Sequence, residues 1–196
     1  DLKFDFPKLT AMDFEIIPGS REFFLATDLG VYYTTEDIIN SASSGDEVWQ
    51  LYGTLLPHVA IDDMVLLYDN NKIRVGTEGR GVWENDLPCE ALEGDILISE
   101  DTEWNSDKRF RKTIRITNGA ELTITSTIRM APGTNFIVEP GAQLTLDGGT
   151  LTNACGDMWQ GIIIKGNTDL PQTASNQGVV VTKNDATIAN AREALF

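Results

Sequence analysis

The chain has 196 residues, of which 41% are hydrophobic and 23% are charged, an ordinary composition for a folded protein. Its formal net charge of −15 argues against nucleic-acid binding, because phosphates require a basic surface. No apolar run approaches the ~18 residues of a membrane span, and Ile162–Ile164, for example, has only the size of a strand, so we expect no span. The chain begins with neither an initiating Met nor a secretory signal, which predicts a mature chain or a piece of a longer one.

Residues 1–88 show the pattern of short strands separated by turns, in two cycles. The segment around Thr27 matches the segment around Thr77 at an offset of 50 residues, which suits a four-stranded propeller blade with its loops. Fewer than two blades fit here and cannot close a ring, so either further blades lie upstream in a longer chain or this region packs differently. Strands are expected over residues 11–17, 22–27, 30–35, 48–52, 63–68, 73–77 and 82–85.

A degenerate turn motif lies between the two cycles. Thr35, Asp37, Gly45 and Trp49 keep the order Thr, Asp, Gly, Trp, with an insertion between the second and the third. This stretch resembles the Asp-box blades of sialidase-type, sortilin-type and plant-polysaccharide-degrading propeller proteins. In that family the box is a fold element, so the resemblance implies that Asp37 bonds turn amides and that Trp49 packs between sheets. It implies no catalysis.

The single histidine and the aromatic residues of this region have simple interpretations. His58 follows Pro57 and has no second histidine, which favours a turn residue over a base or metal ligand. Aromatic residues at strand spacing are more often core than a sugar-stacking platform, so we predict a core position for the following set. The set is Tyr32, Tyr33, Trp49 and Trp83.

Residues 89–113 are predicted to form a junction, with a short strand over 95–99. An acidic segment, Glu100–Trp104, precedes a basic one, Lys108–Lys112, and we interpret both as a solvated turn with local ion pairs. The alternative is an anchor for an anionic glycan or an adjoining domain. We predict no cofactor; calcium is a weaker alternative, since carboxylates are present without the order of a calcium loop. These carboxylates are Glu93, Asp95, Glu100, Asp101 and Glu103.

Residues 114–196 contain an internal repeat. The run Asn118–Ile124 reappears as Glu139–Leu146, so that both Gly119 to Gly141 and Leu122 to Leu144 are offsets of 22. A Gly-Ala turn followed by alternating apolar residues at a fixed interval predicts a β-solenoid, in which Leu122 lies beneath Leu144.

Three successive segments carry a family resemblance over this region. A Gly-Ala-x-Leu-Thr-Ile segment is followed by Cys155–Ile162 with Trp159, and then by Ala186–Ala191. The series resembles the right-handed parallel β-helix regions of large secreted proteins, especially those that Bacteroidetes export by type IX secretion. The resemblance implies a structural role for Trp159, export, and an extracellular or cell-surface location; it implies no particular chemistry. Since the last coil stops at Phe196 without a cap, we expect the native chain to continue.

Two cysteines, Cys89 and Cys155, allow either one disulfide or two free thiols, and an exported protein could form the bridge. Residues of the kind used by pectate-lyase-like enzymes occur singly and mostly at turns, so no catalytic residue is predicted. They are Asp147, Asp157, Lys165, Asp169, Asp185 and Arg192.

The sequence thus predicts an all-β protein, with propeller blades over 1–88, a junction over 89–113 and the start of a parallel β-helix over 114–196. We favour a non-catalytic segment of a large exported adhesin-like protein, acting as a scaffold and recognition surface, with glycans or cell surfaces as candidate partners. Two alternatives stay open: an accessory part of an extracellular polysaccharide-degrading enzyme, and a cargo fragment bound to a type IX secretion translocon.

Overall fold

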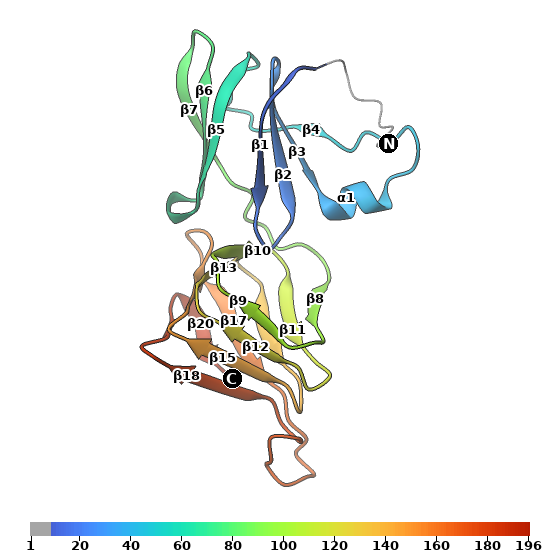
Figure 1. Ribbon diagram of the computed structural model, residues 1–196, viewed down its shortest axis with the longest axis vertical. Coiled ribbons are helices and arrows are strands. Elements are labelled where there is room, and N and C mark those ends of the chain that lie inside the picture. The colour runs from blue at the N-terminus through green and yellow to red at the C-terminus, as the bar shows by residue number, and fades with distance from the viewer. Residues whose placement is uncertain (1–8) are drawn as a thin grey trace. The chain divides into compact units, whose positions relative to one another are not determined.

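The computed structural model describes residues 9–196 and shows an all-β fold (Figure 1). The chain divides into two compact units with the boundary between Pro88 and Cys89, and each unit is described by itself. Among the described residues, no helix has the length and apolar character that crossing a bilayer requires.

The first unit contains two antiparallel sheets, one with the strand order β1-β2-β3-β4 and one with the order β5-β6-β7. A six-residue helix, α1 (Glu36–Ser41), follows β3 and is capped by Thr35, whose Oγ1 accepts a hydrogen bond of 3.2 Å from the Ile38 amide. A 3-10 turn, η1 (Tyr68–Asn70), connects β5 to β6. The strands are β1 (Ala11–Ile17), β2 (Glu22–Thr27), β3 (Gly30–Thr35), β4 (Gln50–Leu51), β5 (Ile61–Leu67), β6 (Lys72–Thr77) and β7 (Gly81–Asp86).

The two sheets of the first unit are repeats of one pattern. The pairing of β1 with β2 shifts register between Ala11 and Asp13, and the pairing of β5 with β6 shifts between Ile61 and Asp63, which lie 50 positions later. A β-bulge at the same place in both sheets fixes the same bend and twist in each. The offset of 50 read around Thr27 is therefore a structural repeat.

The core of the first unit lies between these sheets. Phe24, Ile61, Ile73 and Val75 are fully buried there, and the Phe24 ring lies 5.0 Å from the ring of Tyr52. Because the inward residues alternate along each strand, one face of each sheet is apolar.

The single histidine and the predicted core aromatics have different environments. Tyr33 contacts Phe24 at 5.1 Å between ring centroids, and His58 is an exposed turn residue. Trp83 differs from the expectation of a core position, since it is 41% exposed on the edge strand β7.

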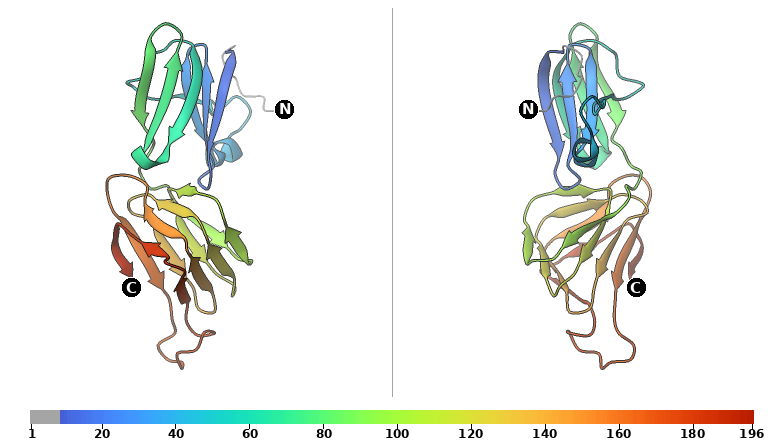
Figure 2. Two further views of the ribbon diagram at one scale, coloured as in Figure 1. Left: turned by 60° about the vertical axis from the view of Figure 1, so that its left-hand side comes forward. Right: turned by 90° about the vertical axis from the view of Figure 1, so that its right-hand side faces the viewer.

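The second unit consists of parallel strands in three sheets (Figure 2). Successive strands enter different sheets, and every third strand returns to the same sheet, so β11 pairs with β8, β12 with β9 and β13 with β10. The sheet orders are β10-β13-β16-β19, β20-β17-β14-β11-β8 and β18-β15-β12-β9.

The strands of this unit are short, because a corner interrupts the chain after every few residues. They are β8 (Asp95–Ile98), β9 (Thr102–Trp104), β10 (Lys108–Phe110), β11 (Thr113–Ile116), β12 (Glu121–Ile124), β13 (Thr127–Met130), β14 (Asn135–Val138), β15 (Gln143–Asp147), β16 (Thr150–Asn153), β17 (Trp159–Ile164), β18 (Val179–Lys183), β19 (Thr187–Ile188) and β20 (Ala191–Leu195).

Columns of apolar side chains fill the space that the three sheets enclose. Leu122 pairs in register with Leu144, and both are fully buried. Phe136 and Trp159 contact edge to face at 6.2 Å. Burying one leucine side chain contributes about 1.5–3 kcal/mol, so a column of such residues holds successive turns of chain in register.

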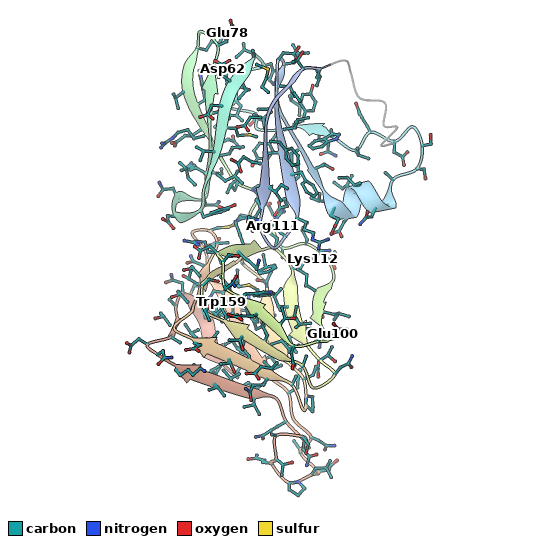
Figure 3. All side chains as sticks on the ribbon, viewed as in Figure 1. Asp62, Glu78, Glu100, Arg111, Lys112 and Trp159 are labelled. Atoms are coloured by element: carbon teal, nitrogen blue, oxygen red, sulfur yellow. A yellow bond between two sulfur atoms is a disulfide. The ribbon has the colours of Figure 1, made fainter. Side chains whose placement is uncertain are left out.

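Residues 89–113 do not form a separate junction. They supply β8, β9 and β10, which are the first strands of the three parallel sheets. The basic run is not a solvated turn either: Arg109 is 1% exposed and Arg111 is 5% exposed. The Arg111 guanidinium donates through Nε to the Glu90 carbonyl at 2.7 Å, so the chain segment after Pro88 covers it (Figure 3).

Corners between the strands depend on glycine and asparagine. Asn118 and Gly119 adopt φ of 57° and 74°, and Gly141 adopts 82° at the same corner one turn later. Such left-handed backbone is accessible to glycine at no steric cost and to asparagine at a small one.

The corner between β17 and β18 carries a long excursion over residues 165–178, which projects away from the sheets (Figures 1 and 2). An isolated bridge between Gly166 and Gln177 closes its base, and Asn176 Nδ2 donates to the Pro171 carbonyl at 2.8 Å. The register resumes after it, because Leu144 pairs with Val180.

Candidate functional site

The candidate site is the outer face of the sheet β9-β12-β15-β18. Outward residues alternate with core residues on each strand, and the parallel register aligns them across strands. One row contains Glu103, Thr123 and Thr145, because Thr123 pairs with both of the others. A second row contains Glu121 and Gln143. The face therefore presents carboxylates and hydroxyls side by side.

A hydrogen-bond network orients one carboxylate of this face. Glu121 Oε1 accepts from Gln143 Nε2 at 2.8 Å and from Thr145 Oγ1 at 2.7 Å. The Glu121 backbone amide donates to Asp101 Oδ1 at 2.9 Å. Glu121 is thus held in place by the strand next to it and by the corner of the preceding turn.

Asp147 lies at the other end of the face and is paired with cations and amides. Asn184 Nδ2 donates to Asp147 Oδ1 at 2.5 Å, and Lys183 Nζ lies 3.1 Å from Oδ2. The hydrogen bond from Asn184, and after it the one from Lys183, holds the pKa of Asp147 below its ordinary value. This carboxyl is therefore ionised and already neutralised in part by Lys183.

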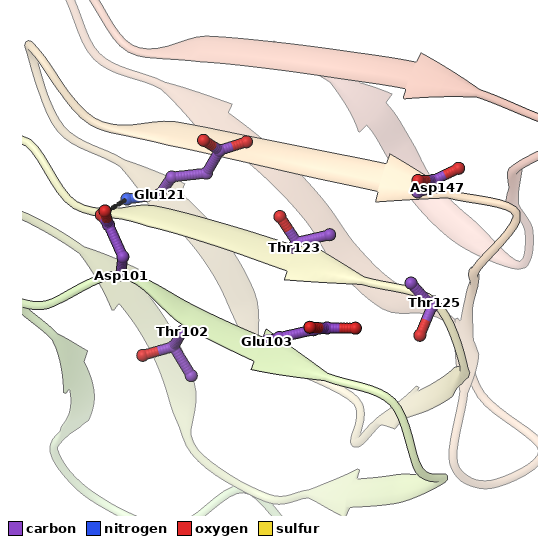
Figure 4. A pocket seen from close by; sticks show the side chains of 7 residues that line it. All are labelled: Asp101, Thr102, Glu103, Glu121, Thr123, Thr125 and Asp147. Carbon is purple, nitrogen blue, oxygen red and sulfur yellow. Dashed lines mark hydrogen bonds between the residues drawn. The ribbon is translucent and has the colours of Figure 1, made fainter.

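These residues line an open depression with a volume of about 450 Å³ (Figure 4). Two lining groups have no hydrogen bond among the described residues, the Glu103 carboxylate and the Thr123 hydroxyl, which lie on neighbouring strands in one row. The full lining is Asp101, Thr102, Glu103, Glu121, Thr123, Thr125 and Asp147. The site offers several acceptors and a few hydroxyl groups on a rigid sheet, which suits binding of hydrogen-bond donors.

Over residues 9–196, no group of three or more His, Cys, Asp or Glu side chains is placed to hold a metal ion. The carboxylates considered for calcium are not gathered in one place: Asp95 Oδ2 binds Arg115 Nε at 2.7 Å on one sheet, whereas Glu103 lies on another sheet, with Asp101 at the corner before its strand.

The structure places the predicted structural residues as follows. Leu122, Leu144 and Trp159 are in the core, and Trp159 Nε1 donates to the Ala189 carbonyl at 2.9 Å. Gly119 and Gly141 are corners of two successive turns. None of the five contributes to the depression.

Cys89 and Cys155 form a disulfide, with their Cα atoms 6.3 Å apart. The bridge ties the start of the second unit to the loop between β16 and β17. It belongs to the scaffold.

Asp37 and Trp49, the residues singled out by the Asp-box resemblance, lie in the segment that contains α1 and leads to β4. Asp37 is in the first turn of α1, where a carboxylate is favoured by the helix dipole. In the turn after the helix, Asp46 Oδ2 accepts a hydrogen bond from the Ser43 amide at 2.7 Å. Trp49 is half-buried.

The other acidic and basic candidates of this unit are not gathered into one site. Asp147 belongs to the depression, whereas Asp169 lies in the excursion and Asp185 in the turn after β18. Glu121 and Thr123 are residues of this face that were not predicted from the sequence. The available signal was the alternation in β12, which fixes their outward direction once the leucine at position 122 faces inward.

Comparisons with known proteins give no relative. No protein-family model matches the chain, and neither a curated protein nor a solved structure is significantly similar to it.

Proposed function

We propose that the chain is a non-catalytic part of an exported surface protein, in which a rigid β scaffold presents a glycan-binding face. In this proposal the first unit corresponds to two successive blades of a propeller and the second to turns of a right-handed parallel β-helix. The 50-residue repeat with matching bulges supports the first assignment. The return of every third strand to the same parallel sheet supports the second.

Export is supported by the disulfide between Cys89 and Cys155. Such bridges persist in oxidising compartments and are rare in the cytosol. The net charge of −15 suits a protein that remains soluble outside the cell.

The outer face of β9-β12-β15-β18 carries the proposal of a ligand. Carboxylates accept hydrogen bonds from sugar hydroxyls and attract ammonium groups, while threonine hydroxyls can donate or accept. Four carboxylates line the depression, and among residues 9–196 only Asp147 has an ion pair with a cation, so a glycan bearing carboxylates or sulfates would be repelled. A neutral or amino-bearing glycan is the class that fits.

The test is calorimetric titration of the full chain with three oligosaccharides of equal length: glucosamine, N-acetylglucosamine and galacturonic acid. We expect saturable binding of the first, weaker binding of the second and none of the third. The variant Glu103→Gln should weaken binding of the glucosamine oligomer about two- to fivefold, since one exposed ion pair contributes up to ~1 kcal/mol.

Glu100→Gln is the matched control, because it removes one carboxylate next to β9 without changing the depression. Preference for the galacturonate oligomer, or an equal effect of both variants, would contradict this assignment.

A further inference from the structure

The two sheets of the first unit agree in detail up to their third strands. Thr27 Oγ1 donates to the Gly30 carbonyl at 2.7 Å in the turn before β3, and Thr77 Oγ1 donates to the Gly81 carbonyl at the same distance before β7. Each turn joins strands that have the same bulge upstream. Strand β7 is thus the structural counterpart of β3.

The sheets differ in what lies beside the third strand. β3 pairs antiparallel with β4, where Tyr32 is opposite Leu51, and Tyr52 N donates to the Val31 carbonyl at 2.7 Å. After β7 the chain instead passes through Leu87 directly into the second unit. In residues 9–196 no strand lies on the outer side of β7.

The counterpart of Val31 is Val82, so the backbone N–H and C=O of Val82 point away from β6. Backbone groups alternate along a strand, and Glu84 therefore points its own pair in the same direction. Val82 is 69% exposed and Trp83 is 41% exposed beside them. β7 has no proline, lysine or bulge, the features that most often prevent pairing at an edge. Its charged residues are Glu84 and Asp86, and the Asp86 carbonyl already accepts from the Tyr52 hydroxyl, so the edge open to pairing is that of Val82 and Glu84.

We propose that the outer edge of β7 binds an extended segment of another polypeptide as a fourth, antiparallel strand. The first sheet gives the chemistry of the partner: an aliphatic residue would lie opposite Trp83, as Leu51 lies opposite Tyr32. Main-chain hydrogen bonds provide the affinity in such strand addition, and alternate side chains provide the selectivity. This inference is independent of the glycan-binding face, which belongs to the second unit.

The experiment uses a fluorescent synthetic peptide with the sequence of residues 47–53, which contains β4, and the full chain as its receptor. Fluorescence anisotropy should show saturable binding with a dissociation constant of roughly 10–1000 μM, the range of a weak interaction. Val82→Pro removes one outward N–H but no bond to β6, and should weaken binding at least about tenfold. Val82→Thr keeps the N–H and should bind within about twofold of the unchanged chain.

Two further measurements keep the test decisive. If Val82→Pro lowers the thermal stability relative to Val82→Thr, the unchanged chain is titrated with two N-methylated peptides instead. One peptide is methylated at the odd-numbered amides and the other at the even-numbered amides. Only one of these two sets faces β7, so one of the two peptides should fail to bind. Binding that no blocked peptide and no Val82 variant reduces would overturn the proposal, as would the absence of saturable binding up to about 1 mM. A dimer that forms with concentration and is lost in Val82→Pro would assign the edge to a second copy and overturn the peptide assignment.

Discussion

Close approach of the backbone at Gly149 gives the sharpest prediction about the parallel sheets. A Cβ atom added at Gly149 would lie 2.5 Å from the Ile124 carbonyl oxygen and 3.0 Å from the Ile124 carbonyl carbon. Both are backbone atoms of the turn below, so no side chain can move aside to make room. The change Gly149→Ala should therefore push two successive turns apart.

The magnitude follows from two opposing effects. Overpacking costs about 1–3 kcal/mol, whereas replacing glycine by alanine stabilises by about 0.4–1 kcal/mol through the unfolded chain. Gly156→Ala is the matched control, because its Cβ would meet nothing within 4 Å and its φ is not left-handed. Gly156→Ala should thus be neutral or stabilising and Gly149→Ala destabilising.

Differential scanning calorimetry of the two variants measures this difference. At about 2–4 °C per kcal/mol for a chain of this size, Gly149→Ala should unfold about 3–10 °C below Gly156→Ala. Equal unfolding temperatures, within about 1 °C, would refute the stacking of turns on which the second unit depends.

Two other predictions concern the disulfide and a carboxyl group of the first unit. Replacing Cys89 and Cys155 by serine removes a cross-link between residues 66 positions apart and should lower the free energy of unfolding by roughly 4 kcal/mol. The measurement is the midpoint of denaturant unfolding, which should fall. If reducing the disulfide of the unchanged protein left this midpoint the same, the prediction would be wrong. Burial, followed by the charges of Asp13 and Asp63, raises the pKa of Glu15. The stability that protonated Glu15 contributes is complete below its unfolded pKa and is lost as pH rises through its folded pKa. Glu15→Gln should therefore raise the unfolding temperature by about 1–2 °C at pH 7 and not below about pH 4, and an equal effect at both pH values would argue against this cause.

The register of the parallel sheets is readable from sequence because two signals coincide. Alternation places Leu122 and Leu144 on the buried face, and the interval of 22 places them one above the other. The composition of the polar face can be predicted from the sequence only in part. Alternation shows that Glu121 points outward, but it does not show that Glu103 and Asp147 line the same face. That proximity depends on which corner ends each strand.

Two features were not predicted from the sequence: the burial of Arg109 and the helix α1. The basic run at residues 108–112 has the composition of a solvated turn, yet Arg109 is buried, which local composition cannot reveal. The helix α1 did have a local signal, since Thr35 precedes Glu36 and Asp37 as an N-cap precedes an acidic first turn. The resemblance to an Asp-box directed attention to Asp37 as a turn residue instead.

The excursion over residues 165–178 has a practical consequence. Leu144 and Val180 are neighbours although 36 positions separate them, whereas Leu122 and Leu144 are neighbours at 22. The extra length leaves the stacked strands undisturbed, because its ends meet at the bridge between Gly166 and Gln177. An epitope or a small tag grafted at this tip should accordingly leave the stacked strands intact.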